Sequence, residues 1–375
     1  MSDSPDYSAV RKPLLEASAL PGHCYTSDGF FEMERDRIFS GAWHFAGRTD
    51  ELPQAGDFLV VDTVVGAAIV CRDSENGLHA FLNACRHRGT RLKDTGGCCA
   101  GFVCPYHAWV YAHDGRLRSA PGMDATEFNK DDYSLQSVWL ETWGGFIFIN
   151  FDDAASNLLT WLGDLPDTMQ GHDPESLVCT RRFDFTIKAN WKFVIENALE
   201  AYHTGTVHQT TLGAQRSESV ATTGQWDALY VLSDEQKSIA TLPGEFQAFP
   251  FIHSLGEKAK QGTWFTVIYP CLQLVFSQDC VWWLDIKPVS VNETSLVVGG
   301  CFPTSTVALE NFTQGAAAYY HRWQTATAED NAIAENQQKG HMAGLHAAGR
   351  FSSAEHCVHA LDNWVLDQIF GELKR

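Results

Sequence analysis

The sequence lacks the motifs that bind nucleotides. None of its 30 glycines lies two residues from another, so there is no G-x-G of the dinucleotide-binding type, and there is no G-x-x-x-x-G-K loop and no H-E-x-x-H. Basic residues are also few, with 27 Lys and Arg against 46 Asp and Glu, a net charge of −19 that disfavours nucleic acids and anionic membranes as partners. Any nicotinamide chemistry would therefore belong to a partner protein.

Long apolar runs are absent as well. No run reaches the ~18 residues of a membrane helix, and the first twenty residues hold no apolar signal-peptide core, which predicts a cytoplasmic protein. The 11 cysteines are an odd number in a long chain without a secretion signal, so a disulfide framework is disfavoured and metal binding becomes the alternative. The 375 residues, 45% of them apolar, suffice for two domains with cores of their own.

The first half of the chain reads as a short helix followed by a small β domain. Residues 26–43 begin at a suitable N-cap and carry apolar side chains at helical spacing. From 57 to 150 the pattern changes to short β-type runs separated by Gly- and Asp-rich turns, which predicts an all-β domain built of hairpins. The polar segment 164–176 reads as a linker.

The second half combines strands with helices. Strand-like alternation follows the linker, and helical patterns are expected at about 190–204 and 308–348. A last helix should follow the capping box formed by Ser352 and Glu355. The predicted fold class is therefore α+β, a small all-β domain plus an antiparallel sheet covered by helices.

Two Cys/His pairs form the strongest motif. Cys85-Arg86-His87 and Cys104-Pro105-Tyr106-His107 each contain one thiol and one imidazole. A zinc knuckle usually groups two cysteines and then two histidines, whereas a Rieske cluster needs one thiolate and one imidazole from each of two loops. We therefore predict a [2Fe-2S] cluster held by Cys85, His87, Cys104 and His107, with a single zinc ion or plain structural roles as the alternatives.

A second group of metal-ligating residues lies in NWKFVIENALEAYHTGTVHQ, residues 190–209. On one helix Glu196, Glu200 and His203 would form a single stripe, which on an ordinary helix would face solvent. His203 and His208 would lie about 140° apart, so both can bind one metal only if the helix is interrupted between them, as Thr204-Gly205-Thr206 permits. Two imidazoles and a carboxylate form the facial triad of non-haem Fe(II) oxygenases. The alternative, a di-iron helical bundle, would need a second E-x-x-H besides Glu200 to His203, and the sequence has none.

The stretch NACRHRG…CPYHAWVY resembles the Rieske domain of the Rieske non-haem iron oxygenases, and the segment around 200 resembles their catalytic motif. The resemblance covers nearly the whole chain, with Ala108 departing from the Gly common in this family. It implies a Rieske domain over 43–165, a catalytic domain of helix-grip (START-like) type over 166–375, and a helical segment 1–42 packed on the catalytic domain.

The same resemblance implies roles for individual residues. His203 and His208 would be iron ligands, and Glu200 would be the acid that bridges a ligand histidine to a Rieske histidine of the neighbouring subunit. Asp330 would be the third ligand, with Asp362 and Asp367 as competitors. Most family members have Asp at the bridging position, and Glu200 resembles the branch that acts on quaternary ammonium compounds such as glycine betaine, proline betaine and carnitine.

The implied activity is that of a terminal oxygenase subunit. It would take electrons from a separate flavin and iron–sulfur NAD(P)H reductase, use O2, form a homotrimer, and hydroxylate or N-demethylate a small substrate, as a monooxygenase rather than a dioxygenase. Aromatic side chains on predicted strands could hold a trimethylammonium group, although such side chains more often pack in the core. The candidates are Trp264, Phe265, Tyr269, Trp282 and Trp283. Aromatic-ring hydroxylation and a Rieske electron carrier or redox sensor are the alternative functions.

Overall fold

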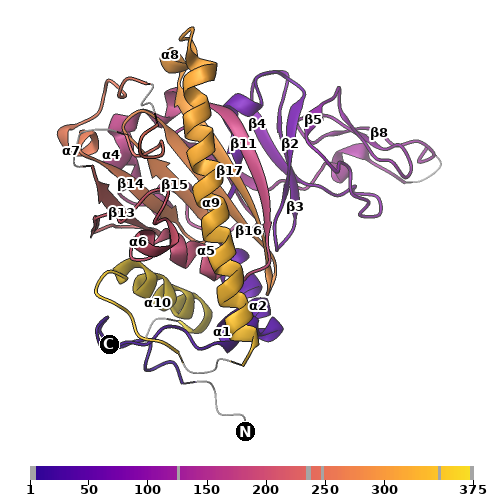
Figure 1. The fold of residues 1–375 in the computed structure, drawn as a ribbon. Helices are drawn as coiled ribbons and strands as arrows, with labels where there is room; N and C mark the ends of the chain where they lie inside the picture. Colours follow the sequence, from indigo (N-terminus) through magenta and orange to yellow (C-terminus); the bar gives the residue numbers. More distant parts are fainter. Residues whose placement is uncertain (1–5, 125–126, 234–237, 246–248, 345–347, 372–375) are drawn as a thin grey trace. The chain divides into compact units, whose positions relative to one another are not determined.

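The computed structural model describes residues 6–124, 127–233, 238–245, 249–344 and 348–371 (Figure 1). The chain divides into two compact units, Ser40–Leu158 and Met1–Phe39 together with Leu159–Arg375. The predicted α+β class is confirmed, and none of the helices in these ranges is long and apolar enough to cross a membrane. The domain boundaries predicted at residues 43 and 166 differ from these limits and stay predictions.

The smaller unit consists of three antiparallel sheets. Its strands run in the orders β1-β10-β9, β4-β3-β2-β5 and β6-β7-β8. The bounds are β1 His44–Arg48, β2 Asp57–Asp62, β3 Ala67–Arg72, β4 Leu78–Leu82, β5 Gly97–Cys98, β6 Phe102–Val103, β7 Val110–Tyr111, β8 Leu117–Ser119, β9 Trp139–Trp143 and β10 Phe146–Asn150. One apolar core, built around Phe102, Trp109 and Tyr111, also contains Cys85 and Cys104. The two motif cysteines are thus fixed by the core of this unit.

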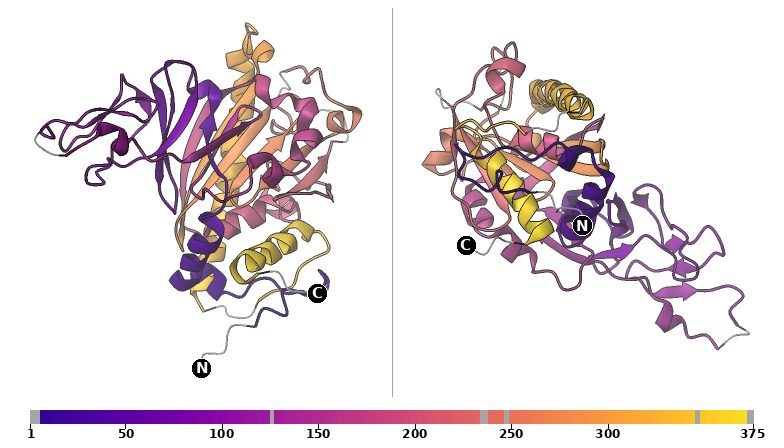
Figure 2. Two further views of the ribbon diagram at one scale, coloured as in Figure 1. Left: turned by 180° about the vertical axis from the view of Figure 1, so that it is seen from behind. Right: turned by 90° about the horizontal axis from the view of Figure 1, so that it is seen from below.

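The larger unit is a seven-stranded antiparallel sheet with helices against it (Figures 1 and 2). The strand order is β11-β17-β16-β15-β14-β13-β12, with β11 Leu177–Ile187, β12 Ser217–Ser219, β13 Trp226–Leu232, β14 Gly262–Ile268, β15 Leu272–Phe276, β16 Val281–Ser290 and β17 Glu293–Pro303. The main helices are α5 Trp191–Ala198, α9 Phe312–Met342 and α10 His356–Phe370. The long helix α9 runs along one face of the sheet (Figure 1).

Two adjacent glycines of β17 allow close packing on both faces of this sheet. A Cβ at Gly300 would lie 1.9 Å from the ring of Trp323 on α9, and one at Gly299 would lie 2.0 Å from the ring of Trp283 on β16. Since neighbouring residues of a strand face opposite sides, each glycine makes room for one tryptophan. Because α9 packs closely on the sheet, the side chains on the inner face of α9 lie at the sheet surface.

Several predicted boundaries differ in the structure. The helix expected over 26–43 is present as α2 (Asp28–Glu34) and a π-helical turn, Arg35–Phe39. The segment expected to be a linker contains α4 (Leu165–Met169) and two 3-10 turns. Of the helix expected over 308–348, residues 312–342 form α9, and residues 345–347 lie outside the described residues. The last helix, α10, is present, but its N-cap is Glu355 and not Ser352. Of the predicted capping box only one hydrogen bond forms, from the Ser352 N–H to Glu355 Oε2 at 2.6 Å.

Within the larger unit, a fully buried ion pair joins the N-terminal segment to α5. Glu34 at the end of α2 binds Lys192 Nζ, and its second oxygen accepts a hydrogen bond from Trp191 Nε1 at 3.0 Å. Both ions are paired and hydrogen-bonded, so breaking the pair by removing one partner would leave an uncompensated buried charge. This pair holds the first turn of α5 in place, immediately before the segment that carries Glu200 and His203.

Candidate metal centres

The two loops of the Cys/His motif have the same backbone geometry. The Gly89 N–H donates to the Cys85 carbonyl at 2.8 Å, and the Ala108 N–H donates to the Cys104 carbonyl at 3.1 Å. The fourth residue after each cysteine has positive φ, +73° at Gly89 and +55° at Ala108. Ala108 therefore occupies a left-handed position that glycine adopts at lower cost. Because the turns are alike, each loop presents its cysteine and histidine in a similar way.

The donor atoms of these loops fit an iron–sulfur cluster. Cys85 and Cys104 are buried free thiols, and His87 and His107 are half-buried with ring centroids 4.7 Å apart. Tyr111 Oη lies 3.2 Å from Cys85 Sγ, and burial raises the pKa of the Cys85 thiol, so a thiolate there needs a cation beside it. His107 Nδ1 is buried with no hydrogen-bond partner among the described residues, as expected of an atom that binds a metal.

The segment after α5 is not one continuous helix. α5 ends at Ala198, before Glu200 and His203, so the predicted stripe of Glu196, Glu200 and His203 on a single helix face is wrong. Glu196 is half-buried, accepts a hydrogen bond from Tyr25 Oη at 2.7 Å, and has a pKa raised to about 7 by burial. The alternative of a solvent-facing stripe is therefore also wrong.

His203 and His208 flank the single helical turn α6, Thr204–Val207. An interruption was predicted within Thr204-Gly205-Thr206, but these residues are helical. The helix is interrupted instead before His203, since α5 ends at Ala198, and α6 ends at Val207, directly before His208. His208 is the C-cap of the turn, with φ −99° and ψ +24°, so its side chain leaves the direction set by the helix. The two imidazole centroids come to 5.2 Å at an interplanar angle of 71°.

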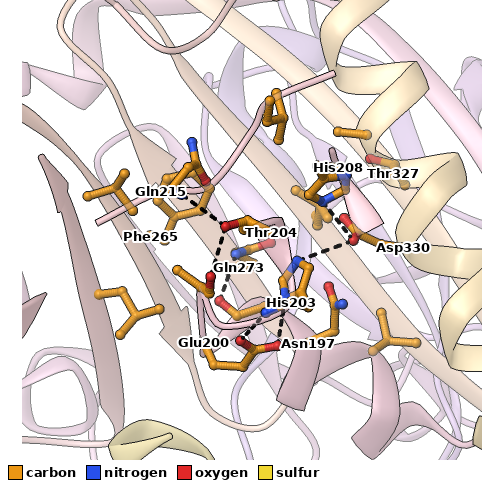
Figure 3. Close-up of a pocket in the computed structure, with 18 of the residues that line it drawn as sticks. Asn197, Glu200, His203, Thr204, His208, Gln215, Phe265, Gln273, Thr327 and Asp330 are labelled. Atoms are coloured by element: carbon orange, nitrogen blue, oxygen red, sulfur yellow. Dashed lines mark hydrogen bonds and ion pairs between the residues drawn. The ribbon is translucent and has the colours of Figure 1, made fainter. Parts of the chain in front are cut away.

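Asp330 of α9 completes the group (Figure 3). Its Oδ1 lies 3.0 Å from His208 Nε2 and 3.5 Å from His203 Nε2, and one ligand atom of each residue lies within 4.8 Å of the others. Asp330 Oδ1 is buried without a hydrogen bond from any described residue. Two imidazole nitrogens and a carboxylate oxygen converging in this way fit a single divalent iron.

The two competing carboxylates have other partners. Asp362 Oδ2 accepts a hydrogen bond from the Leu20 N–H at 3.0 Å, and Asp367 forms an ion pair with Arg11 at 2.6 Å. Neither belongs to a metal-binding group among the described residues. Of the three candidates for the third ligand, the structure brings only Asp330 to the two histidines.

Carboxylates also lie on the far side of both imidazole rings. Glu200 Oε1 is 2.5 Å from His203 Nδ1, and Glu329 Oε2 is 2.7 Å from His208 Nδ1. A carboxylate on Nδ1 keeps the proton there and leaves Nε2 free to ligate. Although burial opposes it, the nearby carboxylates of Asp330 and Glu329 raise the pKa of His208. Sequence reasoning missed Glu329, whose position directly before Asp330 on α9 was the available signal.

A cavity of about 80 Å³ opens onto these residues. Phe265 and Trp282 line it, whereas Trp264, Tyr269 and Trp283 do not. Trp264 and Trp283 each neighbour a lining residue on the same strand, and alternate residues of a strand face opposite sides of the sheet. Tyr269 lies beyond the end of β14, where its hydroxyl donates to Asp227. The polar residues of the cavity wall include Asn197, Thr204, Gln215, Gln273 and Thr327 (Figure 3).

The fold and the two residue groups define a class of protein: a small β unit with a two-loop Cys/His motif, and a helix-covered sheet with two histidines and a carboxylate at its cavity. Residues 42–138 match the Rieske [2Fe-2S] domain, and residues 172–371 match the catalytic domain of the ring hydroxylating alpha subunit. The chain belongs to this family of Rieske-type oxygenase alpha subunits, as the motifs predicted.

Individual relatives agree with this assignment. The chain is 33% identical over 243 residues to the glycine betaine monooxygenase oxygenase subunit of Pseudomonas aeruginosa strain UCBPP-PA14, covering 63% of this chain and 54% of that protein. It is 32% identical over 263 residues to the carnitine monooxygenase oxygenase subunit of Escherichia coli K12, covering 69% and 67%. The match thus spans about half the length of the glycine betaine relative.

The fold is also shared with a solved structure. This chain superposes on a quaternary ammonium Rieske monooxygenase with a TM-score of 0.83, over 99% of this chain and 100% of that one. That structure is described in connection with carnitine oxidation and inter-subunit electron transfer. The sequence identity is 23%, so this likeness shows the fold. It confirms the predicted combination of a Rieske domain with a sheet-rich catalytic domain.

Proposed function

We propose that this chain is a terminal oxygenase subunit that hydroxylates or N-demethylates a small quaternary ammonium compound. The observation that carries the proposal is the convergence of His203, His208 and Asp330 within 4.8 Å at the cavity. Three protein donors would leave coordination positions open on a bound Fe(II), as an oxygenase requires and a purely structural metal site does not.

The proposed metal assignments follow from the donor atoms. Cys85, His87, Cys104 and His107 would hold the [2Fe-2S] cluster, within a Rieske domain that we place at 43–165. His203, His208 and Asp330 would hold the iron, within a catalytic domain at 166–375 on which residues 1–42 pack. When bound, the cluster supplies one-electron transfer and the Fe(II) supplies activation of O2.

The chain's own carboxylates prepare the site. Glu200 and Glu329 each accept a hydrogen bond from the Nδ1–H of a histidine, and thereby orient the two Nε2 atoms toward Asp330. Glu200 is held in turn by the backbone N–H groups of Tyr202 and His203, so its own position is fixed. The ligand side chains are therefore positioned before any metal or substrate enters.

The cavity wall and the relatives support the substrate class. Asn197, Gln215 and Gln273 give the cavity several polar groups, and the carboxylates near its floor would compensate a cationic substrate. The two curated relatives are named for glycine betaine and carnitine. Aromatic-ring hydroxylation remains the alternative within the family, since Phe265 and Trp282 also line the cavity.

The reaction balances with an external electron source. One methyl group, O2, two electrons and two protons give a hydroxymethyl group and water. The C–N bond of a hydroxymethyl group on the quaternary nitrogen then breaks, which gives formaldehyde, a proton and the tertiary amine. We propose that the electrons come from a separate NAD(P)H reductase, because the sequence has no dinucleotide fingerprint. We also propose a homotrimer in which Glu200 joins the iron site to the cluster of the neighbouring subunit.

Metal analysis and turnover test the proposal together. Anaerobic reconstitution should give three irons and two acid-labile sulfides per chain, whereas a carrier or sensor would contain two irons. With a surrogate reductase, glycine betaine or carnitine should stimulate oxygen uptake and release formaldehyde, and benzoate-type acids should not. Stoichiometric zinc, or oxygen uptake that follows only the aromatic acids, would overturn the metal or the substrate assignment respectively.

A further inference from the structure

A buried cation forms part of the wall of the iron-site cavity. Arg322 lies on α9, two helical turns before Asp330, and its side chain lines the same cavity. Only 5% of the residue is exposed. Its Nε donates to the Ile239 carbonyl at 3.2 Å, and its Cζ lies 4.9 Å from the centroid of the Trp282 ring. Neither of these contacts neutralises the charge.

No carboxylate forms an ion pair with Arg322 in the part of the chain that the structure describes. Asp279, a buried acid next to Cys280, is instead bound by the hydroxyls of Ser238 and Tyr319 at 2.6 and 2.5 Å. Burial lowers the pKa of Arg322 to about 10, which leaves the guanidinium charged near neutral pH. A buried cation that has five N–H donors and, within the described parts of the chain, one protein acceptor is costly unless an anion binds to it.

Arg322 lies on the same side of α9 as Asp330, one of the three residues at the candidate metal position. Arg322, Ala326 and Asp330 follow one another at intervals of four residues, so they lie along one side of α9, and all three line the cavity. At 1.5 Å per residue the two ends of this row are about 12 Å apart along the helix axis. The cavity therefore has a carboxylate-rich end at the histidines and a guanidinium farther along α9.

Arg322 also changes what the aromatic residues can do. Its guanidinium covers Trp282, so that face of the indole is not available to a second cation. Phe265, which meets Trp282 edge-on at 5.9 Å, has no Arg or Lys over its ring among the described residues. The cavity thus offers one uncovered aromatic ring, fewer than an all-aromatic cage for a trimethylammonium group would have.

We propose that Arg322 binds the carboxylate of a zwitterionic substrate, and so selects quaternary ammonium carboxylates over quaternary ammonium alcohols such as choline. The inference rests on the proposed function and names the substrate class within it. A guanidinium can take both oxygens of a carboxylate through parallel N–H bonds, which fixes the direction of the substrate as well as its affinity. The ammonium end then points toward the carboxylates around the iron.

The test compares a carboxylate with its neutral isostere. Dissociation constants of glycine betaine, carnitine and glycine betaine amide are measured by calorimetry on metal-loaded wild type, Arg322→Gln and Arg322→Lys. Arg322→Gln should weaken the two carboxylates on the order of thirtyfold or more and change the amide by less than about threefold. Arg322→Lys keeps the charge but loses the paired N–H donors of the guanidinium. Its dissociation constants for the two carboxylates should therefore lie between those of wild type and of Arg322→Gln.

A control for the arginine–tryptophan contact is available on β11, where Arg182 is exposed. Arg182 lies over Trp283, 5.0 Å from its centroid, as Arg322 lies over Trp282, but Arg182 does not line the cavity. Arg182→Gln should leave all three dissociation constants unchanged. If Arg322→Gln is poorly folded by its circular dichroism and iron content, Arg322→Lys alone decides, because a retained carboxylate preference at wild-type strength would contradict bidentate binding.

The outcomes separate this inference from the proposed function. If wild type binds betaine and Arg322→Gln binds it equally well, Arg322 is a structural residue and the proposed function stands. If wild type binds none of the quaternary compounds but binds benzoate in an Arg322-dependent way, the carboxylate site stands and the quaternary ammonium assignment fails. Equal binding of betaine and its amide by wild type overturns the inference directly.

Discussion

Glu329 holds the outer side of His208: its Oε2 lies 2.7 Å from His208 Nδ1. The next residue, Asp330, approaches the Nε2 atom of the same ring at 3.0 Å. Two consecutive residues of α9 thus contact opposite edges of one imidazole, one as an orienting acid and one at the metal position. A small rotation of α9 would disturb both contacts at once, so the packing of this helix on the sheet bears directly on the site.

Glu329→Gln is expected to weaken iron binding while leaving the fold intact. The amide removes the charge that stabilises the Nδ1 proton of His208, and loss of such an outer partner typically costs ten- to a hundredfold in metal affinity or activity. Iron content after dialysis against a graded chelator measures the effect. Glu335→Gln on the same helix is the control, because Glu335 is half-buried and accepts a hydrogen bond from the Lys188 N–H at 3.0 Å, and an amide oxygen can still accept that bond. Equal iron retention in the two variants would show that Glu329 does not orient His208.

Local motifs were predictable from sequence because local geometry decides them. The C-x-H and C-x2-H pairs lie within single turns, and the structure indeed places both in equivalent loops. Asp330 was different, since it lies 122 positions after His208 in the sequence (330 − 208 = 122), and spacing says nothing about a contact made by tertiary packing. Only the resemblance to a family indicated Asp330, and the same long separation hid Glu329.

The aromatic lining shows a second limit. Trp282 and Trp283 are adjacent, and one lines the cavity while the other faces away, so a prediction needs to know which face of the strand is covered by α9. That depends on the strand register and on Gly299 and Gly300, which admit one tryptophan on each side. A run of aromatic residues gives neither the register nor the direction of the covering helix.

Ala108→Gly is expected to stabilise the smaller unit. The φ of +55° costs an L-residue about 1–2 kcal/mol, and the added flexibility of glycine in the unfolded chain offsets about half of that, which leaves a gain of up to about 1 kcal/mol. Bleaching of the cluster absorbance in urea measures the change. Ala154→Gly in an exposed turn without positive φ should be neutral or destabilising. An Ala108→Gly variant that bleaches earlier would show that the methyl group makes a favourable contact.

His172 should make the larger unit sensitive to acid. It is 1% exposed, and burial lowers its pKa from 6.5 to about 4. Between pH 6.5 and about 4, His172 binds a proton in the unfolded chain but not in the folded chain. The free energy of unfolding therefore falls as the pH drops below 6.5, by about 2 kcal/mol at pH 5. Thermal midpoints at pH 7.5 and 5.0 should therefore differ less in His172→Leu than in wild type.

The control for His172 is the exposed residue His253. His253→Leu should keep the wild-type difference between the two midpoints. Comparing differences, rather than midpoints at one pH, separates the titration of His172 from any packing defect that the leucine introduces, because a packing defect shifts both midpoints alike. If His172→Leu and wild type lose stability equally between pH 7.5 and 5.0, another group carries the acid sensitivity.

Glu200→Gln tests the link between the two metal centres. With iron in excess the variant should still take up all three irons, because Glu200 contacts His203 Nδ1 and not the metal position, although its affinity for the third iron should fall as in Glu329→Gln. Turnover per bound iron should fall about a hundredfold as the ligand loses its orienting charge. Reduction of the cluster by dithionite should stay normal, while its reoxidation by O2 with substrate present should slow. Glu218→Gln on an exposed edge strand should behave as wild type. If Glu200→Gln also turned over at the wild-type rate, Glu200 would not join the sites, and the argument from this glutamate to quaternary ammonium substrates would be lost.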